Sequence, residues 1–145
     1  MSFPDLTTRW RAWAPYLLST LRIVTAFLFI QYGSTKLLGL PAAPVMPGGG
    51  TAPLTSLPGI AGVFELVGGA LLLLGLFTRP VAFLLAGEMA VAYFMGHAPR
   101  AFWPILNEGA PAILYCFIWL YISSAGPGPW SLDALRRGKT GAVDR

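Results

Sequence analysis

Residues 59–77 read GIAGVFELVGGALLLLGLF, an apolar run interrupted by a single charged residue, Glu65. At about 1.5 Å rise per residue, a helix over this run is about 28 Å long, close to the thickness of the hydrocarbon core of a bilayer. We therefore predict a transmembrane helix here. A carboxylate inside such a helix is costly and normally faces a partner or a cavity, so Glu65 is a candidate functional residue.

The composition of the whole chain is that of a membrane protein. Hydrophobic residues make up 55% of the 145 residues and charged residues 11%, whereas an ordinary soluble domain has about a quarter charged residues. The net charge is +4, but no basic stripe follows a polar face, so we predict a lipid bilayer and no nucleic acid as partner. Cys116 and His97 are the single cysteine and histidine. They exclude a CxxC pair, a cysteine-ligated iron–sulfur cluster and bis-histidine haem within one chain, and no intrinsic cofactor is evident.

Three further apolar segments lead us to predict an all-α, four-helix transmembrane bundle within residues 16–125. The predicted spans cover residues 16–40, 59–77, 81–95 and 107–124. Thr78-Arg79-Pro80 is expected to form a tight turn between the second and third spans. Pro111 falls in the first turn of the fourth span, where proline is tolerated.

The segments outside the spans have distinct compositions. Residues 1–15 form a predicted interfacial tail with Trp10 and Trp13 beside arginines. Residues 41–58 are rich in proline and glycine, so they form an outer loop that either caps the bundle or serves as a plain linker. Residues 126–145 form a second tail, in which Ser131 is predicted to cap a short amphipathic turn.

Four spans place both termini on the same side of the membrane. Most basic residues fall on that side, while Lys36 and Arg100 lie near the other. The positive-inside rule then predicts that both termini are cytoplasmic and that both long loops face outward.

Charged and polar residues of the spans are predicted to form two layers. Arg22, Thr25, Phe29, Tyr32 and Lys36 are spaced by 3, 4, 3 and 4 residues, so they share one helical face that should point into the bundle. The outer layer contains the candidate ligand-binding or proton-exchange residues Lys36, Glu65, Tyr32, Gln31, Asn107, Glu108 and His97. Either Lys36 and Glu65 form an ion pair that only fixes helix packing, or the layer lines a pocket that binds a polar head group or relays protons.

A deeper group, comprising Arg22, Arg79 and Glu88, is predicted to be buried or structural. Glu88 lies near mid-membrane, where it should be protonated or paired with Arg22. A structural pairing and a proton-relay role are both open. His97 is an interfacial side chain or a ligand.

Other features carry weaker signals of chemistry. Glu65, His97 and Glu108 come from three helices without fixed spacing, so we predict no metal site. Tyr115, Trp119 and Ile122 form a stripe typical of a bundle core or interface belt, with a cofactor box as the alternative. Cys116 is interpreted as a packing residue.

The chain resembles the DoxX family of small bacterial membrane proteins. The resemblance rests on Leu21-Arg22, Gly33-Ser34-Thr35-Lys36-Leu37, Glu65-Leu66-Val67-Gly68-Gly69, Leu74-Gly75-Leu76-Phe77-Thr78-Arg79 and Gly126-Pro127-Gly128-Pro129-Trp130-Ser131-Leu132-Asp133. It implies a multi-pass protein of the bacterial inner membrane. Some members are described as the small membrane subunit of a thiosulfate:quinone oxidoreductase, and others as partners in membrane redox complexes. The family's Arg, Lys and Glu features fall on Arg22, Lys36, Glu65 and Arg79.

One segment departs from the family pattern, since members often read Asn-Gly-Gly-Glu where this chain has Asn107-Glu108-Gly109-Ala110. Together, residues and resemblance predict a subunit or accessory of a quinone-linked membrane oxidoreductase, with quinone as ligand and electrons supplied by a partner redox subunit. Lys36 would orient the head group and Glu65 would exchange protons. The alternative is a non-enzymatic scaffold, chaperone or small transporter; whether the chain is itself an enzyme, and whether it forms a homo-oligomer, stay open.

Overall fold

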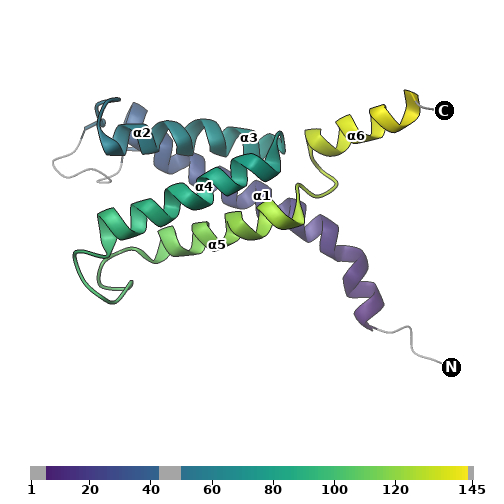
Figure 1. The fold of residues 1–145 in the computed structure, drawn as a ribbon, viewed down its shortest axis with the longest axis horizontal. Helices are drawn as coiled ribbons and strands as arrows, with labels where there is room; N and C mark the ends of the chain where they lie inside the picture. Colours follow the sequence, from purple (N-terminus) through teal and green to yellow (C-terminus); the bar gives the residue numbers. More distant parts are fainter. Residues whose placement is uncertain (1–5, 43–49, 144–145) are drawn as a thin grey trace.

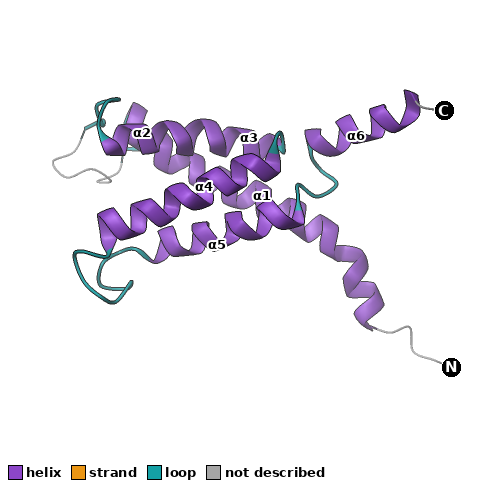
Figure 2. Ribbon diagram, in the orientation of Figure 1, coloured by secondary structure: helices purple, strands orange, loops and turns teal. Residues whose placement is uncertain are grey.

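The computed structural model describes residues 6–42 and 50–143, and every regular element in those two ranges is a helix (Figure 2). The elements are α1 (Leu6–Leu38), α2 (Leu57–Val63), η1 (Phe64–Gly68), α3 (Gly69–Leu74), α4 (Thr78–Ala92), η2 (Tyr93–His97), α5 (Ala110–Ala125) and α6 (Leu132–Val143). The two η elements are π-helical turns. They join their neighbours into continuous helices over Leu57–Leu74 and Thr78–His97.

Three of these helices are long and apolar enough to cross a membrane: Thr8–Leu38, Leu57–Leu74 and Thr78–His97. The fourth, α5, is apolar but shorter, at 16 residues. The fold is therefore all-helical, with three long helices and one shorter helix for the spans predicted from sequence.

The helices pack as two pairs that meet in a common core. Helix α1 packs along α2, η1 and α3, whereas α4 packs along α5; the pairs touch where η1 and α3 meet α4. Fully buried apolar side chains fill the centre: Phe29, Leu72, Leu85, Trp119 and Ile122. Tyr115 stacks on Trp119 at a centroid distance of 5.9 Å. The stripe of Tyr115, Trp119 and Ile122 is therefore packing core, as the first of its two interpretations predicted.

The start of α1 and the whole of α6 lie at the same end of the bundle, and residues 39–42, 50–56 and 98–109 lie at the other (Figure 1). We call these the terminal end and the loop end. Part of the predicted outer loop, residues 43–49, is outside the described residues. Its later part returns to α1, because the backbone N–H of Ala52 donates a hydrogen bond of 2.7 Å to the carbonyl of Lys36.

Helix α1 begins at Leu6, so the described part of the predicted tail is helical and continuous with the first span. Pro15 was taken as the boundary, but it lies inside the helix. Proline removes one backbone hydrogen bond and bends a helix without necessarily ending it. The first turns of α1 consequently leave the bundle at the terminal end (Figure 1), with Trp10 and Trp13 exposed.

The turn between the second and third spans is displaced from the predicted position. Helix α3 ends at Leu74 because Gly75 adopts a left-handed conformation (φ 67°). Helix α4 already begins at Thr78, so Thr78-Arg79-Pro80 is its first turn and the prediction of a tight turn there is wrong. Pro80 is accepted because the amides of a first helical turn have no partner within the helix.

The fourth helix also starts later than predicted, at Ala110, and Asn107 and Glu108 precede it. Glu108 has a left-handed backbone (φ 58°), which is incompatible with a helical turn. Pro111 occupies the first turn, as predicted. In the C-terminal segment, Ser131 caps α6 by accepting a 3.1 Å hydrogen bond from the N–H of Ala134, also as predicted, although the helix runs for 12 residues.

Candidate functional site

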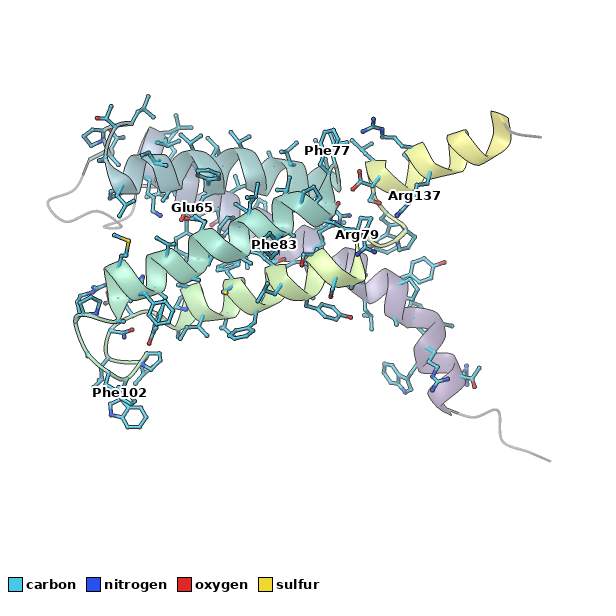
Figure 3. All side chains as sticks on the ribbon, viewed as in Figure 1. Glu65, Phe77, Arg79, Phe83, Phe102 and Arg137 are labelled. Carbon is cyan, nitrogen blue, oxygen red and sulfur yellow. The ribbon has the colours of Figure 1, made fainter. Side chains whose placement is uncertain are left out.

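The loop half of the bundle contains a buried ion pair between the first two long helices. The ammonium of Lys36, near the end of α1, lies 2.5 Å from Oε1 of Glu65 in η1. The Glu65 side chain is only 3% exposed and points into the bundle (Figure 3). The predicted meeting of these two residues is therefore observed. The second oxygen, Oε2, is buried without a hydrogen-bond partner among the described residues.

The two helices can approach closely here because α1 presents a glycine to η1. A Cβ atom on Gly33 would lie 2.5 Å from the backbone N of Leu66 and 2.7 Å from the carbonyl oxygen of Gly62. Real side chains do not tolerate such distances, so only glycine fits. This backbone contact holds α1 against η1 and brings Lys36, one turn further along α1, to the level of Glu65.

Glu88 lies midway along the continuous helix Thr78–His97, near neither end of the bundle. Both of its carboxylate oxygens are buried, with no hydrogen-bond partner in the described structure. The alternative that Glu88 pairs with Arg22 is wrong. Arg22 is fully buried and donates hydrogen bonds to backbone carbonyls at the terminal end, including those of Leu73 and Pro127 at 2.9 Å.

A cavity of about 600 Å³ lies between α2–η1 and α4–η2. Its wall is mostly apolar, and several of its side chains, such as Ile60, Leu84 and Val91, are about half exposed. The cavity is therefore open to the surroundings of the bundle. Ionisable side chains also line it: Lys36, Glu88, His97 and Arg100. Its size and mixed lining are typical of a site for a small amphipathic molecule.

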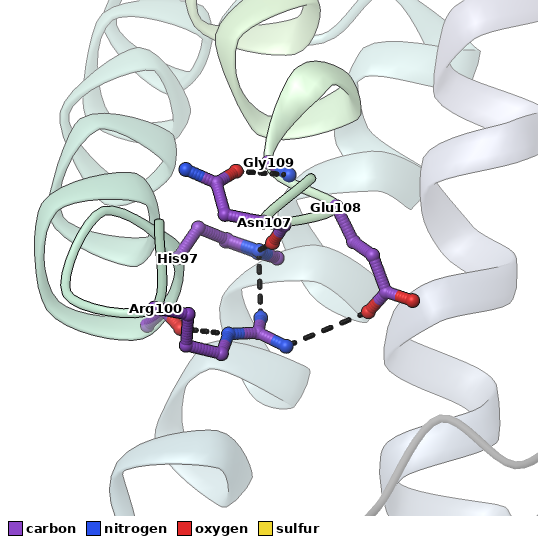
Figure 4. Close-up of polar contacts among 6 residues, drawn as sticks. His97, Arg100, Asn107, Glu108 and Gly109 are labelled. Carbon is purple, nitrogen blue, oxygen red and sulfur yellow. Dashed lines mark hydrogen bonds and ion pairs between the residues drawn. The ribbon is translucent and has the colours of Figure 1, made fainter. Parts of the chain in front are cut away.

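The loop that follows η2 supplies one end of this cavity (Figure 4). Asn107 is 1% exposed and organises the loop: its amide donates to the carbonyl of Ala101 at 2.8 Å, and Oδ1 accepts from the N–H of Gly109 at 2.8 Å. Nδ1 of His97 lies 2.8 Å from both the carbonyl oxygen of Asn107 and Nη2 of Arg100. This nitrogen can donate to the carbonyl or accept from the guanidinium, but not both, so the tautomer of His97 selects its partner.

The structure brings together only part of the predicted outer layer. Lys36 and His97 line the cavity, with Glu65 directly behind Lys36. The Glu108 side chain is 81% exposed and lies 3.5 Å from Arg100 (Figure 4), and it is not among the residues that line the cavity. Asn107 is occupied by loop contacts.

Tyr32 and Gln31 do not line the cavity. Tyr32 is 38% exposed, in contrast to the buried Thr25 and Phe29 of the same predicted stripe. Its ring meets that of Tyr115 on α5, at a centroid distance of 6.1 Å. Tyr32 therefore belongs to the α1–α5 side of the bundle.

Arg22 and Arg79 stabilise helix ends at the terminal end. Besides Leu73 and Pro127, Arg22 donates to the carbonyls of Leu72 and Trp130, which ties the end of α3 to the segment before α6. Arg79 donates to the carbonyls of Ser123 and Ser124 at the end of α5. The guanidinium groups satisfy carbonyls that a helix end leaves unpaired.

Sequence reasoning missed two residues that matter to this arrangement. Arg100 was seen only as a loop cation, because its position at the cavity depends on the turn after η2. Asp133 caps α4 from a distant part of the chain, accepting from the N–H groups of Phe77 at 3.0 Å and Thr78 at 2.8 Å. Burial alone would raise the pKa of Asp133, but these hydrogen bonds and the charge of Arg137 outweigh it and lower the pKa below its ordinary value.

The side chains that line the cavity are suited to binding and proton exchange. No group of three or more histidine, cysteine, aspartate or glutamate side chains able to hold a metal ion occurs in residues 6–42 and 50–143. Cys116 is half-buried against the core, away from the cavity. The cavity is lined by the ammonium of Lys36, which is paired with Glu65, and by the carboxyl of Glu88, which has no partner among the described residues. Near the loop it is lined by the guanidinium of Arg100 and the imidazole of His97.

The long apolar helices and the buried charges define a helical membrane protein. The DoxX family model matches residues 17–98, more than half of the chain, and the chain belongs to the DoxX family.

Two relatives match over most of their length. A protein of Haemophilus influenzae described as "Uncharacterized protein" is 46% identical over 122 residues, which cover 82% of this chain and 90% of the relative. The "Inner membrane protein YphA" of Escherichia coli is 29% identical over 128 residues, which cover 82% of this chain and 89% of the relative. No solved structure matches the chain.

Proposed function

We propose that the protein is a four-span protein of the bacterial inner membrane that binds a quinone or a similar lipophilic molecule in the cavity between α2 and α4. In this role it is a subunit or accessory of a membrane redox system. The observation that carries the proposal is the cavity itself: it is mostly apolar and open to the surroundings, and its wall contains Glu88 and Lys36, the ion-pair partner of Glu65.

The membrane topology supports this location of the cavity. The two ends of the chain lie at one end of the bundle (Figure 1), which requires an even number of crossings. The fourth crossing is α5, whose 16 residues correspond to about 24 Å, slightly less than the hydrocarbon core. Because Arg9, Arg11, Arg136 and Arg137 lie at the terminal end, that end faces the cytoplasm by the positive-inside rule. The cavity then lies in the outer half of the membrane.

The side chains at the cavity suit a ligand with a polar ring and a hydrocarbon tail. Ile60, Leu84 and Val91 line the opening and face the surrounding lipid, so a ligand dissolved in the bilayer enters without crossing water. Lys36 and Glu65 stand at the polar side. In a low dielectric a fixed charge pair orients a ring carbonyl more strongly than it would in water.

Electrons for any redox chemistry would come from a partner chain. The sequence has one cysteine and one histidine, and members of the family are described as membrane subunits of redox complexes. The partner redox subunit and a homo-oligomer are thus parts of this proposal. The protein's own contribution is the ligand site.

A cavity-filling substitution tests the proposal. Ala61 lines the cavity, whereas Ala70, on the same continuous helix, is exposed and does not. We expect Ala61→Phe to reduce the amount of quinone that co-purifies in mild detergent, as measured by mass spectrometry of the extracted lipids. Ala70→Phe, the same change on the outer surface, should leave it unchanged. Equal quinone in both variants, with both folded, would rule out the cavity as the site.

The second candidate function is a scaffold whose buried charges fix helix packing. The observation in its favour is that Arg22, Arg79 and Lys36 all bond to elements other than their own. Lys36→Ala separates the two functions. A variant that inserts and folds but loses ligand supports the site, whereas one that fails to assemble supports the packing role.

A further inference from the structure

Among the described residues, Glu88 is the one carboxyl that lines the cavity. Its neighbours in the wall, Leu84 on the preceding turn and Val91 and Ala92 on the next, are apolar. Glu65 on η1 and Lys36 on α1 are the charged groups on the facing helices, and His97 and Arg100 line the same cavity. Both oxygens of Glu88 are buried, and none of the described side chains or backbone groups hydrogen-bonds to them.

The charges around Glu88 do not balance if it is ionised. The ammonium of Lys36 contacts Oε1 of Glu65 at 2.5 Å, so this cation is already paired with a carboxylate. A second carboxylate at the same depth would be uncompensated near mid-membrane and repelled by Glu65. A proton on Glu88 removes both penalties.

We propose that Glu88 holds its proton in the membrane and is the hydrogen-bond donor that the cavity offers to the carbonyl oxygen of a lipophilic ligand. This inference rests on the proposed function, because it takes the cavity to be a ligand site. The ligand is then an uncharged molecule with a carbonyl group. The residue that carries the proton is Glu88, in place of the predicted Glu65.

Geometry makes Glu88 the suitable donor. Its side chain lines the cavity while its carboxyl group is turned away from water. Because the carboxyl makes no hydrogen bond within the described structure, it can rotate toward a ligand without breaking one. Lys36 would first have to leave Glu65, which would uncover a buried carboxylate. A protonated Glu88 can donate a hydrogen bond, so it favours a ligand with an acceptor oxygen, such as a quinone carbonyl.

Carbodiimide labelling of the full-length protein in membranes tests the protonation state. Dicyclohexylcarbodiimide dissolves in lipid and adds to a protonated carboxyl; the acid O–H adds across a C=N bond, and rearrangement to an N-acylurea leaves the whole reagent attached. We expect the peptide that contains Glu88 to gain the mass of one reagent molecule at neutral pH, and the peptide that contains Glu65 to remain unmodified. Labelling of Glu65 in place of Glu88, or no labelling of either, would overturn the inference.

A binding measurement tests the donor role. For Glu88→Leu, we expect the affinity for a short-chain ubiquinone such as decylubiquinone to fall by about five- to tenfold, the effect of one lost hydrogen bond. Glu88→Gln, whose amide can still donate, should retain most of the affinity. Glu108→Gln is the matched control, because Glu108 lies outside the cavity. Equal affinity of Glu88→Leu and the wild type would overturn the donor role.

The two experiments separate the failure of this inference from that of the proposed function. Saturable quinone binding by the wild type without carbodiimide labelling of Glu88 would overturn the inference and leave the cavity as a ligand site. Labelling of Glu88 that decylubiquinone does not slow would overturn the donor role and count against the cavity as the site. Labelling that decylubiquinone slows supports both.

Discussion

Replacement of Lys36 by methionine should destabilise the protein strongly, and more at neutral than at acidic pH. The change removes the ion-pair partner of Glu65 and leaves a carboxylate whose side chain is 3% exposed without its counter-charge. Breaking a buried ion pair from one side costs about 3–5 kcal/mol. The carboxyl can escape by taking up a proton, which at pH 7 costs about 3.7 kcal/mol for an ordinary pKa of about 4.3, at about 1.36 kcal/mol per pH unit.

These two magnitudes predict that Lys36→Met lowers the free energy of unfolding by about 3–4 kcal/mol at pH 7. At pH 5, where protonation of Glu65 is less costly, the predicted decrease is only about 1 kcal/mol. In the variant, the folded state binds more protons than the unfolded state, so its stability rises relative to the wild type as the pH falls. The double variant Lys36→Met/Glu65→Gln removes both charges and should stay within about 1 kcal/mol of the wild type.

The assay is unfolding by sodium dodecyl sulfate in mixed micelles, followed by tryptophan fluorescence at both pH values. The reasoning would be refuted if the decreases in free energy of unfolding caused by Lys36→Met and by Glu65→Gln simply added up in the double variant. It would also be refuted if the decrease for Lys36→Met were the same at pH 7 and pH 5.

Three further predictions concern the helix ends and the helix contacts. Asp133→Ala should cost about 1–2 kcal/mol as a lost cap of α4. Because folding lowers the pKa of Asp133, this contribution is present above the ordinary pKa of about 3.9 and is lost as the pH falls through the folded value, which acid titration of both proteins would reveal. Arg22→Lys should lower the melting temperature clearly, because a single ammonium cannot reach the carbonyls from Leu72 to Trp130 that the guanidinium spans; an unchanged melting temperature would contradict this. Gly33→Ala should cost about 1–3 kcal/mol by pushing η1 away from α1, whereas Gly87→Ala, where an added Cβ meets nothing within 4 Å, should be neutral or stabilising in the same unfolding assay.

The helical class and the Lys36–Glu65 pair could be predicted because both follow from local spacing. Apolar runs of membrane length predict the long helices, and residues at intervals of 3 and 4 share a face. Equal depth below the loop end then places Lys36 opposite Glu65. The remaining requirement, a close approach of the two backbones, is met by Gly33 on α1, which the prediction did not use.

The missed features depend on contacts between distant parts of the chain. The start of α4 at Thr78 is set by Asp133, 55 residues away, so the local pattern at Thr78-Arg79-Pro80 read as a turn. Glu88 was one predicted partner of Arg22, but Arg22 donates to backbone carbonyls instead. Every residue has a backbone carbonyl, so the sequence does not indicate which of them accept. Glu108 was predicted to belong to the outer polar layer, but its backbone is left-handed and its side chain is exposed.

Photolabelling with a quinone that carries a reactive azide tests the cavity as a ligand site most directly. With the full-length protein in native membranes, our account predicts saturable labelling of peptides from α2–η1 and from α4–η2, competition by unlabelled decylubiquinone, and loss of labelling in Ala61→Phe. Labelling that is spread over the lipid-facing surface of α5, or that neither unlabelled quinone nor Ala61→Phe reduces, would contradict a ligand site between α2 and α4.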